Sequence, residues 1–284
     1  MSEIFLSICV PMIFLDSYTA ETILQSLKRG ENEIEISIDL GLSESIIRLA
    51  EYKWDISKLR KIVEDPDTVY FINEEGVFKA AIRGKSFYKL MPAGKNKAPA
   101  LLIDGVLMHR IKDIDPMKDA RMKAKLCARK GSEMLEICTG LGYSTIACLD
   151  NAVSTITTIE RDSDVIELAR INPWSQRLFE DERVEMIIGD ASEKIKMFSN
   201  KRFNGVLHDP PRFTLGPELY TEDFYEELYR VMKPKGVLYH YVGSPGSRYK
   251  KKDLPKGIMT RLRKVGFQRV QRKNDTLGVT GFKP

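Results

Sequence analysis

Two glycines, Gly140 and Gly142, lie between a predicted strand at 134–138 and a predicted helix at 144–149. Because glycine has no Cβ atom, such a loop lets the backbone approach a bound ligand closely. The next apolar stretch along the chain ends in an acid, Glu160. An acid at this place in a strand–loop–helix–strand unit accepts hydrogen bonds from ribose hydroxyls. The spacing therefore predicts a site for a nucleoside-containing ligand at the carboxyl edge of a parallel sheet.

The same loop carries no sign of a phosphate site. A nicotinamide dinucleotide needs a third small residue where the helix begins, so that the pyrophosphate can meet the helix N-terminus. Here Gly142 is followed by Tyr143 and Ser144, and no basic residue marks a phosphate. A ligand that has a nucleoside but no phosphate fits these residues better.

The elements that position these residues alternate between strands and helices from 118 to 284. This alternation predicts an α/β fold with a Rossmann-like, mostly parallel sheet and right-handed crossovers. Two closing strands predict an antiparallel hairpin at one edge of that sheet. Strands are expected at 134–138, 155–159, 184–188, 205–208, 237–241, 267–272 and 278–282, and helices at 118–129, 144–149, 164–171, 192–197, 222–232 and 256–265.

Residues 1–117 are predicted to form a smaller N-terminal α+β domain that adds substrate contacts. Asp115-Pro116 marks the boundary, and Asp104-Gly105 is a turn signal inside the domain. Strands are expected at 4–15, 33–40, 69–71, 77–82, 85–91 and 100–110, helices at 19–28 and 56–64, and a polar loop at 92–99.

The composition is that of an ordinary soluble globular chain of 284 residues. A formal charge of +5 permits an anionic partner such as RNA without requiring one. The apolar stretch at 4–15 is short and contains Pro11, so neither a signal peptide nor a membrane span is expected. Unpaired cysteines (Cys9, Cys127, Cys138 and Cys148) favour the reducing cytoplasm, and with three dispersed histidines they give no metal-ligand pattern.

From about residue 118 to the C-terminus, the chain resembles the class I S-adenosylmethionine-dependent methyltransferases. The resemblance rests on the glycine loop, Glu160, the Gly189-Asp190-Ala191 stretch and the Asp209-Pro210-Pro211 stretch, each following a strand in the family's order. The segments HDPPRF and LYHYVG also resemble a group of predicted archaeal methyltransferases. The resemblance implies S-adenosyl-L-methionine as the cofactor.

The resemblance also assigns roles along this cofactor. Glu160 would hold the ribose, Asp190 and the Ala191 amide would pair with adenine, and Glu136 with the loop amides would flank the amino-acid end. The expected cofactor residues are Glu136, Cys138, Thr139, Gly140, Gly142, Tyr143, Ser144, Glu160, Arg161, Asp190, Ala191 and Asp209.

The expected catalytic residues are Asp209, Pro210, His208 and Arg212. In methyltransferases that act on planar or amide nitrogens, the acid and the first proline's carbonyl accept hydrogen bonds from the target amino group. This orients the nitrogen lone pair toward the sulfonium, and positioning supplies most of the catalysis. The alternative is that the two prolines only stiffen the exit from the strand.

Two features of this stretch leave the acceptor open. Arg212 occupies the place of the family's aromatic residue, with Phe213 one position later, so it can stack on a base or bind a phosphate or carboxylate. His208 and His240 each end a strand, either as packed core residues or as proton acceptors. The expected activity is methyl transfer to a nitrogen of an RNA base or a small molecule. The basic run at 248–252 agrees with RNA but also with a solvated surface.

Two alternatives remain beside the methyltransferase. The stretches 216–225 and 231–238 are similar to spermidine synthase-like aminopropyltransferases, which share the sheet and use decarboxylated S-adenosylmethionine. Those enzymes carry an acid in the glycine loop and a polyamine-binding Asp-Ser-Ser-Asp type stretch. This chain has Leu141 in the loop and Arg212 after Asp209, which favours methyl transfer over aminopropyl transfer. The second alternative is a non-catalytic binding module of the same fold.

Overall fold

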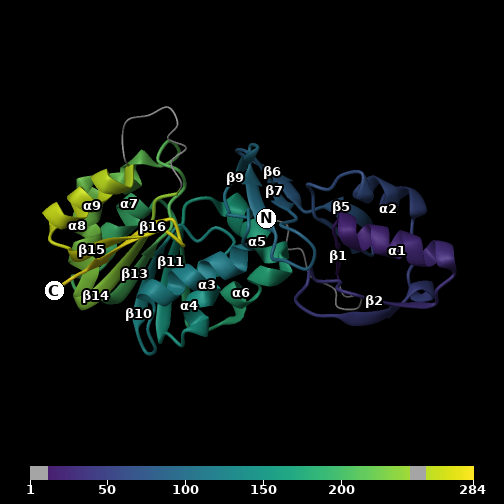
Figure 1. Ribbon diagram of the computed structural model, residues 1–284, viewed down its shortest axis with the longest axis horizontal. Coiled ribbons are helices and arrows are strands. Elements are labelled where there is room, and N and C mark those ends of the chain that lie inside the picture. Colours follow the sequence, from purple (N-terminus) through teal and green to yellow (C-terminus); the bar gives the residue numbers. More distant parts are fainter. Residues whose placement is uncertain (1–11, 244–253) are drawn as a thin grey trace. The chain divides into compact units, whose positions relative to one another are not determined.

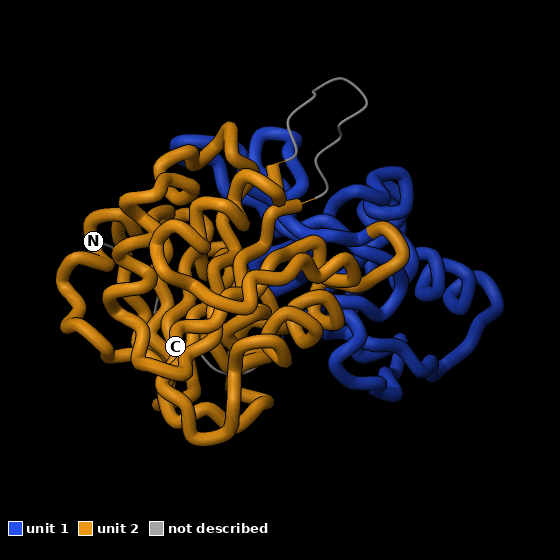
Figure 2. Tube along the Cα trace, turned by 60° about the vertical axis from the view of Figure 1, so that its left-hand side comes forward, with its two compact units in different colours: residues 1–111 blue, residues 112–284 orange. Residues whose placement is uncertain are grey.

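The computed structural model describes residues 12–243 and 254–284. The chain forms two compact units, Met1–Ile111 and Lys112–Pro284, which are coloured separately in Figure 2. A domain boundary after residue 117 remains a prediction; the helix that contains this position begins at Pro116, where Asp115 caps it by accepting from the Lys118 amide. Most of the strand expected at 4–15 and the whole basic run at 248–252 lie outside the described residues.

Over its described residues, 12–111, the first unit contains small antiparallel sheets and two α-helices (Figure 1). Its helices are α1 (Ser17–Arg29) and α2 (Ile56–Val63), which pack together over buried side chains such as Ile23 and Leu59. Its strands are β1 (Ile13–Leu15), β2 (Glu33–Ile36), β3 (Ser45–Arg48), β4 (Tyr70–Asn73), β5 (Gly76–Lys79), β6 (Ala81–Arg83), β7 (Phe87–Met91), β8 (Ala100–Ile103) and β9 (Val106–Leu107).

Several strands of this unit are shorter than the sequence pattern predicts, and two of them end at a local turn. The strand expected at 33–40 ends at Ile36, because the Ser37 hydroxyl accepts a hydrogen bond from the Gly41 amide and closes a turn. The strand expected at 100–110 folds back at Asp104, whose φ of 46° lies in the left-handed region, so β8 and β9 pair as a hairpin. A local turn interrupts the alternation in both cases.

The second unit is built on a seven-stranded sheet in the order β12-β11-β10-β13-β14-β16-β15. The first five strands of that order are parallel, and β16 and β15 close the edge as an antiparallel hairpin. The predicted fold class is confirmed. The strands are β10 (Glu133–Ile137), β11 (Thr155–Glu160), β12 (Val184–Ile188), β13 (Phe203–His208), β14 (Met232–Tyr241), β15 (Gln268–Lys273) and β16 (Gly278–Phe282).

Helices cover both faces of this sheet. On one face α3 lies against β13, β14 and α4, and on the other α8 packs beside α9 (Figure 1). The helices are α3 (Pro116–Cys127), α4 (Tyr143–Asp150), α5 (Ser163–Ile171), α6 (Arg177–Glu180), α7 (Ala191–Lys194), α8 (Glu222–Val231) and α9 (Leu254–Val265). The helix expected at 192–197 is shorter than predicted, since α7 passes into a 3₁₀ turn at Ile195–Met197.

Strand register places four strand ends in one row. Ile137 of β10 pairs with Ile159 of β11 and with His208 of β13, and His208 pairs with His240 of β14. The next residue of each strand or loop is therefore presented at one level of the carboxyl edge. These residues are Cys138, Glu160, Asp209 and Tyr241.

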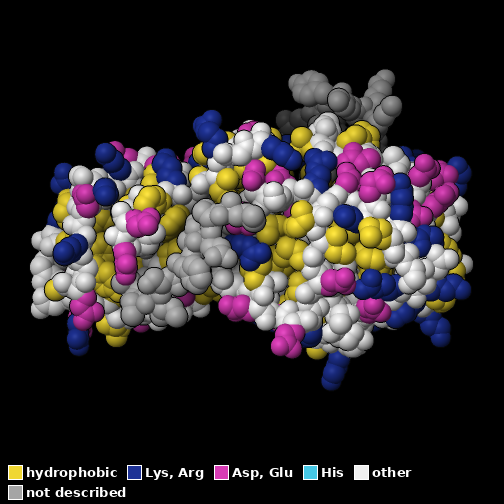
Figure 3. Space-filling view, turned by 180° about the vertical axis from the view of Figure 1, so that it is seen from behind, with side chains coloured by type: hydrophobic (Ala, Val, Ile, Leu, Met, Phe, Trp, Pro, Cys, Tyr) yellow, Lys and Arg dark blue, Asp and Glu magenta, His cyan; other side chains and the backbone are white. Residues whose placement is uncertain are grey.

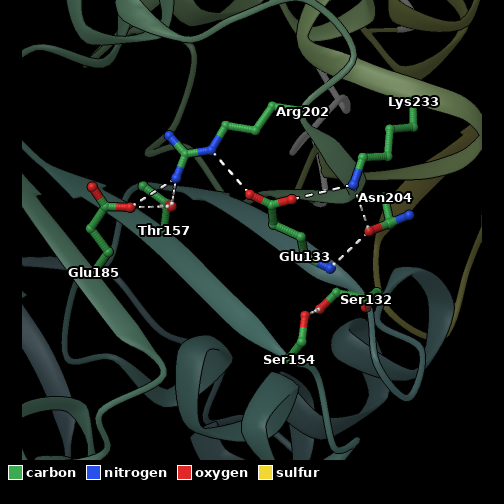
Figure 4. A network of polar contacts seen from close by, with 8 residues as sticks. All are labelled: Ser132, Glu133, Ser154, Thr157, Glu185, Arg202, Asn204 and Lys233. Atoms are coloured by element: carbon green, nitrogen blue, oxygen red, sulfur yellow. Dashed lines mark hydrogen bonds and ion pairs between the residues drawn. The ribbon is translucent and has the colours of Figure 1, made fainter.

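A network of polar contacts links strands of this sheet away from its carboxyl edge (Figure 4). Glu133, the first residue of β10, binds Arg202 Nε at 3.1 Å and Lys233 Nζ at 3.2 Å through its two carboxylate oxygens. Arg202 also reaches Glu185 of β12 at 2.9 Å. One carboxylate thus ties β10 to residues from the starts of β13 and β14, which helps fix the register at the carboxyl edge.

The surface shows no concentration of charge on the face in Figure 3, where basic and acidic side chains of the described residues intermingle. Within residues 12–243 and 254–284, no helix combines the length and the apolar character that crossing a membrane requires.

Candidate active site

The glycine loop after β10 contains backbone conformations that glycine adopts more easily than other residues. Gly140 and Gly142 have φ angles of 55° and 76°. A Cβ atom on Gly142 would lie 2.6 Å from Leu178 Cδ2, so this glycine also allows close packing. The backbone of the loop therefore favours glycine at both positions, and close packing favours it further at Gly142.

Glu160 connects the loop to the end of β11. Its Oε2 accepts a hydrogen bond from the Gly140 amide at 3.0 Å, and its Oε1 accepts one from the Asp162 amide at 3.1 Å. The side chain is 9% exposed, and burial raises its pKa above the ordinary value. The carboxylate is thus held at the loop, at the strand end where the sequence predicts a ribose contact.

Glu136 is completely buried beneath the loop. Its Oε2 accepts hydrogen bonds from the hydroxyls of Thr145 and Thr158, whereas Oε1 has no partner among the described residues. Burial raises the pKa of Glu136 to about 8. The Thr158 hydroxyl also contacts the Thr139 hydroxyl at 2.6 Å. In this structure Glu136 supports the loop from within the core, and its predicted contact with a ligand remains untested.

Asp190 caps α7 beyond the end of β12. Its Oδ1 accepts from the amide and the hydroxyl of Ser192, and the hydroxyl bond lowers the pKa of Asp190. Ala191 beside it is buried. Arg161, which follows Glu160, forms a 3.5 Å ion pair with Glu218. The acids predicted to contact ribose and adenine thus lie at the ends of adjacent strands.

Tyr143 and Ser144 are placed in the first turn of α4 and are buried. The Tyr143 hydroxyl accepts a hydrogen bond from Asn172 Nδ2 at 2.9 Å. Cys138 has a φ of 71° and is half-buried, and burial raises the pKa of its thiol well above the ordinary value. These side chains shape the loop and its neighbouring helix.

Asp209, directly after β13, forms an ion pair that the sequence analysis missed. Its Oδ2 lies 2.8 Å from Lys123 Nζ, and Lys123 also binds Asp119 Oδ2 at 2.9 Å. Lys123 Nζ lies 4.3 Å from the centre of the Tyr241 ring. Burial opposes the charged form of Lys123, but the charges of Asp209 and Asp119 outweigh it and raise the pKa above its ordinary value. The lysine is therefore an ammonium ion.

A signal for part of this cluster exists in the sequence. Asp119 and Lys123 are four residues apart on the predicted helix at 118–129, a spacing that brings an acid and a lysine together. The contact to Asp209 spans 86 positions. It depends on the packing of α3 against the sheet, which no local pattern reveals.

His208 and His240 are fully buried, with ring centres 4.3 Å apart and ring planes tilted by 34°. His208 Nε2 pairs with the Leu219 carbonyl at 2.9 Å, and His240 Nε2 pairs with the Tyr225 hydroxyl at 3.1 Å. Burial lowers the pKa of His208 to about 4. Both rings are packed as neutral core groups in this structure.

The residues after Asp209 form a partly exposed loop. Pro210 is buried, and the Pro211 carbonyl accepts a hydrogen bond from the Tyr220 hydroxyl at 2.7 Å. Phe213 packs edge-on against Tyr220 and remains 45% exposed. Arg212 is exposed and forms no ion pair with a described residue. The loop therefore offers a guanidinium close in sequence to Asp209.

The described residues contain no group of three or more His, Cys, Asp or Glu side chains arranged to hold a metal ion. The carboxyl edge instead combines a glycine loop, two carboxylates at adjacent strand ends and an aspartate paired with a buried lysine. Such a site can bind a nucleoside and position a nucleophile.

Comparisons with known proteins point to one family. The family model described as "Spermine/spermidine synthase domain" matches residues 117–271. An uncharacterized protein of Methanocaldococcus jannaschii is 41% identical over all of this chain and 99% of its own length. A polyamine aminopropyltransferase of Sulfolobus acidocaldarius is 29% identical over 51% of this chain and 50% of its own length. Spermidine synthase from Thermotoga maritima has a similar fold, with a TM-score of 0.58 and 21% identity over 72% of this chain and 71% of its own.

These similarities contradict the predicted methyltransferase activity and favour the aminopropyltransferase alternative. The prediction was wrong because it rested on the glycine loop, Glu160 and Asp190, which are the residues expected for any sulfonium nucleoside, whichever group is transferred from it. The two classes differ at the loop acid and in the stretch after Asp209, where this chain departs from the aminopropyltransferase pattern. Those departures do not change the family, because its model matches residues 117–271.

Proposed function

The chain belongs to the spermine/spermidine synthase domain family, and on that premise we propose that it is an aminopropyltransferase. The donor would be decarboxylated S-adenosylmethionine, and the acceptor an amine. The observation that supports this proposal most directly is Asp209. It follows the row of strand ends beside the glycine loop, and its Oδ1 accepts no hydrogen bond from a described residue.

The proposed reaction is a substitution at carbon. The lone pair of the acceptor nitrogen attacks the aminopropyl carbon that is bonded to the sulfonium, and a new C–N bond forms. The C–S bond breaks and its electron pair stays on sulfur, which leaves the neutral thioether 5′-methylthioadenosine. The alkylated nitrogen then releases one proton to solvent. Because the sulfonium is already a good leaving group, the protein contributes mainly by positioning the two substrates.

The described residues supply the contacts that this reaction needs. Glu160, fixed at the loop by the Gly140 amide, would accept hydrogen bonds from the ribose hydroxyls of the donor. Asp190 would accept from the adenine amino group. Asp209 Oδ1 would accept a hydrogen bond from the acceptor amine and orient its lone pair. The half-buried position of Asp209 strengthens this contact relative to one in water.

The experiment is an assay of the thioether product. The protein is incubated with decarboxylated S-adenosylmethionine and, separately, with 1,4-diaminobutane, n-butylamine or 4-aminobutanoate. Chromatography then measures 5′-methylthioadenosine. Formation of this thioether with at least one amine, beyond the rate without protein, is expected. Failure with all three amines while intact S-adenosylmethionine yields S-adenosylhomocysteine would contradict the proposal.

A further inference from the structure

The environment of the Lys123 ammonium has the composition of a site for a substrate amine. It includes two carboxylates, from Asp119 and Asp209, and the face of the Tyr241 ring. Carboxylates and aromatic faces are the groups that recognise alkylammonium ions in proteins. Here the protein's own side chain fills that environment: the side chain of Lys123 is 8% exposed, and that of Asp119 is 4% exposed.

The lysine changes the charge that a substrate would meet. Two carboxylates without it carry a charge of −2, which suits a diamine with two ammonium groups; with Lys123 the cluster carries −1. Asp119 is buried and already paired with the lysine, so only Asp209, whose side chain is 20% exposed, faces outward. One amine can therefore be held, through Asp209 Oδ1, without an uncompensated positive charge.

The charge of Arg212 also disfavours an acceptor with two ammonium groups. It lies three residues after Asp209, is exposed, and has no acidic partner among the described residues. A second ammonium group on the acceptor would add to this positive charge, whereas a carboxylate would pair with it. The positive charges of Lys123 and Arg212 thus disfavour a polycation and favour an acceptor with an acidic group.

We propose that Lys123 occupies the subsite of a second substrate ammonium group, so that the acceptor of this enzyme is an amine without a second cationic group. Lys123 is then a specificity-determining residue, and an amine with a carboxylate is the preferred acceptor. The identification of an acceptor rests on the proposed aminopropyl transfer. The occupation of the subsite does not, because binding alone can test it.

The test uses three acceptors of the same chain length: 1,4-diaminobutane, n-butylamine and 4-aminobutanoate. For the wild-type protein, kcat/KM is expected to be highest with 4-aminobutanoate and lowest with 1,4-diaminobutane. Lys123→Ala opens the subsite and should raise kcat/KM for the diamine relative to 4-aminobutanoate by at least about tenfold. Lys125→Ala, an exposed lysine on the same helix, is the matched control and should keep the wild-type order.

Thermal unfolding supplies a readout that does not need turnover. Lys123→Ala leaves two facing carboxylates, so 1,4-diaminobutane should raise the Tm of this variant and leave that of wild type and Lys125→Ala unchanged. If the variant does not fold without the diamine, recovery of folded protein in its presence is the same result.

The outcomes separate the two proposals. A wild-type preference for 1,4-diaminobutane over 4-aminobutanoate would support aminopropyl transfer and overturn the role of Lys123. No product with any amine, together with diamine-dependent stabilisation of Lys123→Ala alone, would count against aminopropyl transfer and support the subsite. Absence of diamine stabilisation in a folded Lys123→Ala would overturn the subsite.

Discussion

Lys123 Nζ lies 2.8 Å from Asp209 Oδ2, so the aspartate that follows β13 forms an ion pair with a lysine from α3, which it shares with Asp119. This contact joins the covering helix to the carboxyl edge of the sheet. It leaves Asp209 Oδ1 as the oxygen that, in the proposed reaction, would accept from a substrate amine. The proposed reacting position would then depend on an acid whose geometry is fixed by the protein before any ligand binds.

Asp209→Asn tests that assignment. The amide keeps the size of the side chain but removes the charge that orients the acceptor amine, so kcat should fall by at least about a hundredfold. Binding of 5′-methylthioadenosine, measured by calorimetry, should change little because Glu160 and Asp190 are untouched. Loss of thioether binding together with turnover would make Asp209 a donor-binding or structural residue instead.

Glu160→Gln should weaken binding of the donor. The glutamine can still accept from the Gly140 amide, but the hydrogen bonds to the ribose lose their charge, and affinity for 5′-methylthioadenosine should fall by about tenfold or more. Calorimetry measures this, with the exposed Glu180→Gln on α6 as the control. Unchanged affinity in Glu160→Gln would place the ribose elsewhere.

Gly142→Ala should destabilise the protein more than Gly140→Ala. Both residues have positive φ, which costs an alanine about 1–2 kcal/mol. Only at Gly142 does the new Cβ also meet Leu178 Cδ2, at 2.6 Å, whereas nothing lies within 4 Å at Gly140. Urea unfolding should therefore show a further loss of about 1–3 kcal/mol for Gly142→Ala. Equal losses would mean that the packing against Leu178 relaxes freely.

The buried Glu136 should make stability depend on pH. The ordinary pKa of 4.5 applies to the unfolded chain, and burial raises the folded value to about 8. Between these two values the folded state binds more protons than the unfolded chain. The free energy of unfolding should therefore decrease as the pH rises through this window, by up to about 1.4 kcal/mol per pH unit. Glu136→Gln, which cannot titrate, should lose less stability in urea unfolding between about pH 5 and about pH 8.

The exposed Glu167→Gln is the control for that experiment, because its side chain is 63% exposed on α5. It should retain the wild-type slope. If Glu136→Gln retained that slope as well, the loss of stability on raising the pH would have another origin.

Local patterns were sufficient to predict the sheet and the position of the glycine loop. Gly140 and Gly142 interrupt an apolar strand, and Glu160 ends the next one, so their sequence order alone fixed their place at the carboxyl edge. Strand β3 and helix α6 were missed because each is only four residues long and carries no clear periodicity. His208 and His240 were recognised as strand ends, but their burial follows from packing against η4 (Pro217–Tyr220) and α8.

The identity of the transferred group was not predicted correctly, for a physical reason. Glu160 and Asp190 suit an adenosine that any sulfonium donor carries, so they do not distinguish the group that leaves. The Asp209 stretch distinguishes acceptors only through its partners, and Lys123 lies 86 positions away. The side chains that we propose to select the substrate meet only in the folded chain, and a single sequence does not pair them.

The most direct test of aminopropyl transfer is the mass of the acceptor after reaction. With decarboxylated S-adenosylmethionine and 4-aminobutanoate, mass spectrometry should show an increase equal to one aminopropyl group on the acceptor, together with an equal amount of 5′-methylthioadenosine. If 1,4-diaminobutane, n-butylamine and 4-aminobutanoate all stay unmodified with this donor, or gain only a methyl group, the account of aminopropyl transfer is contradicted.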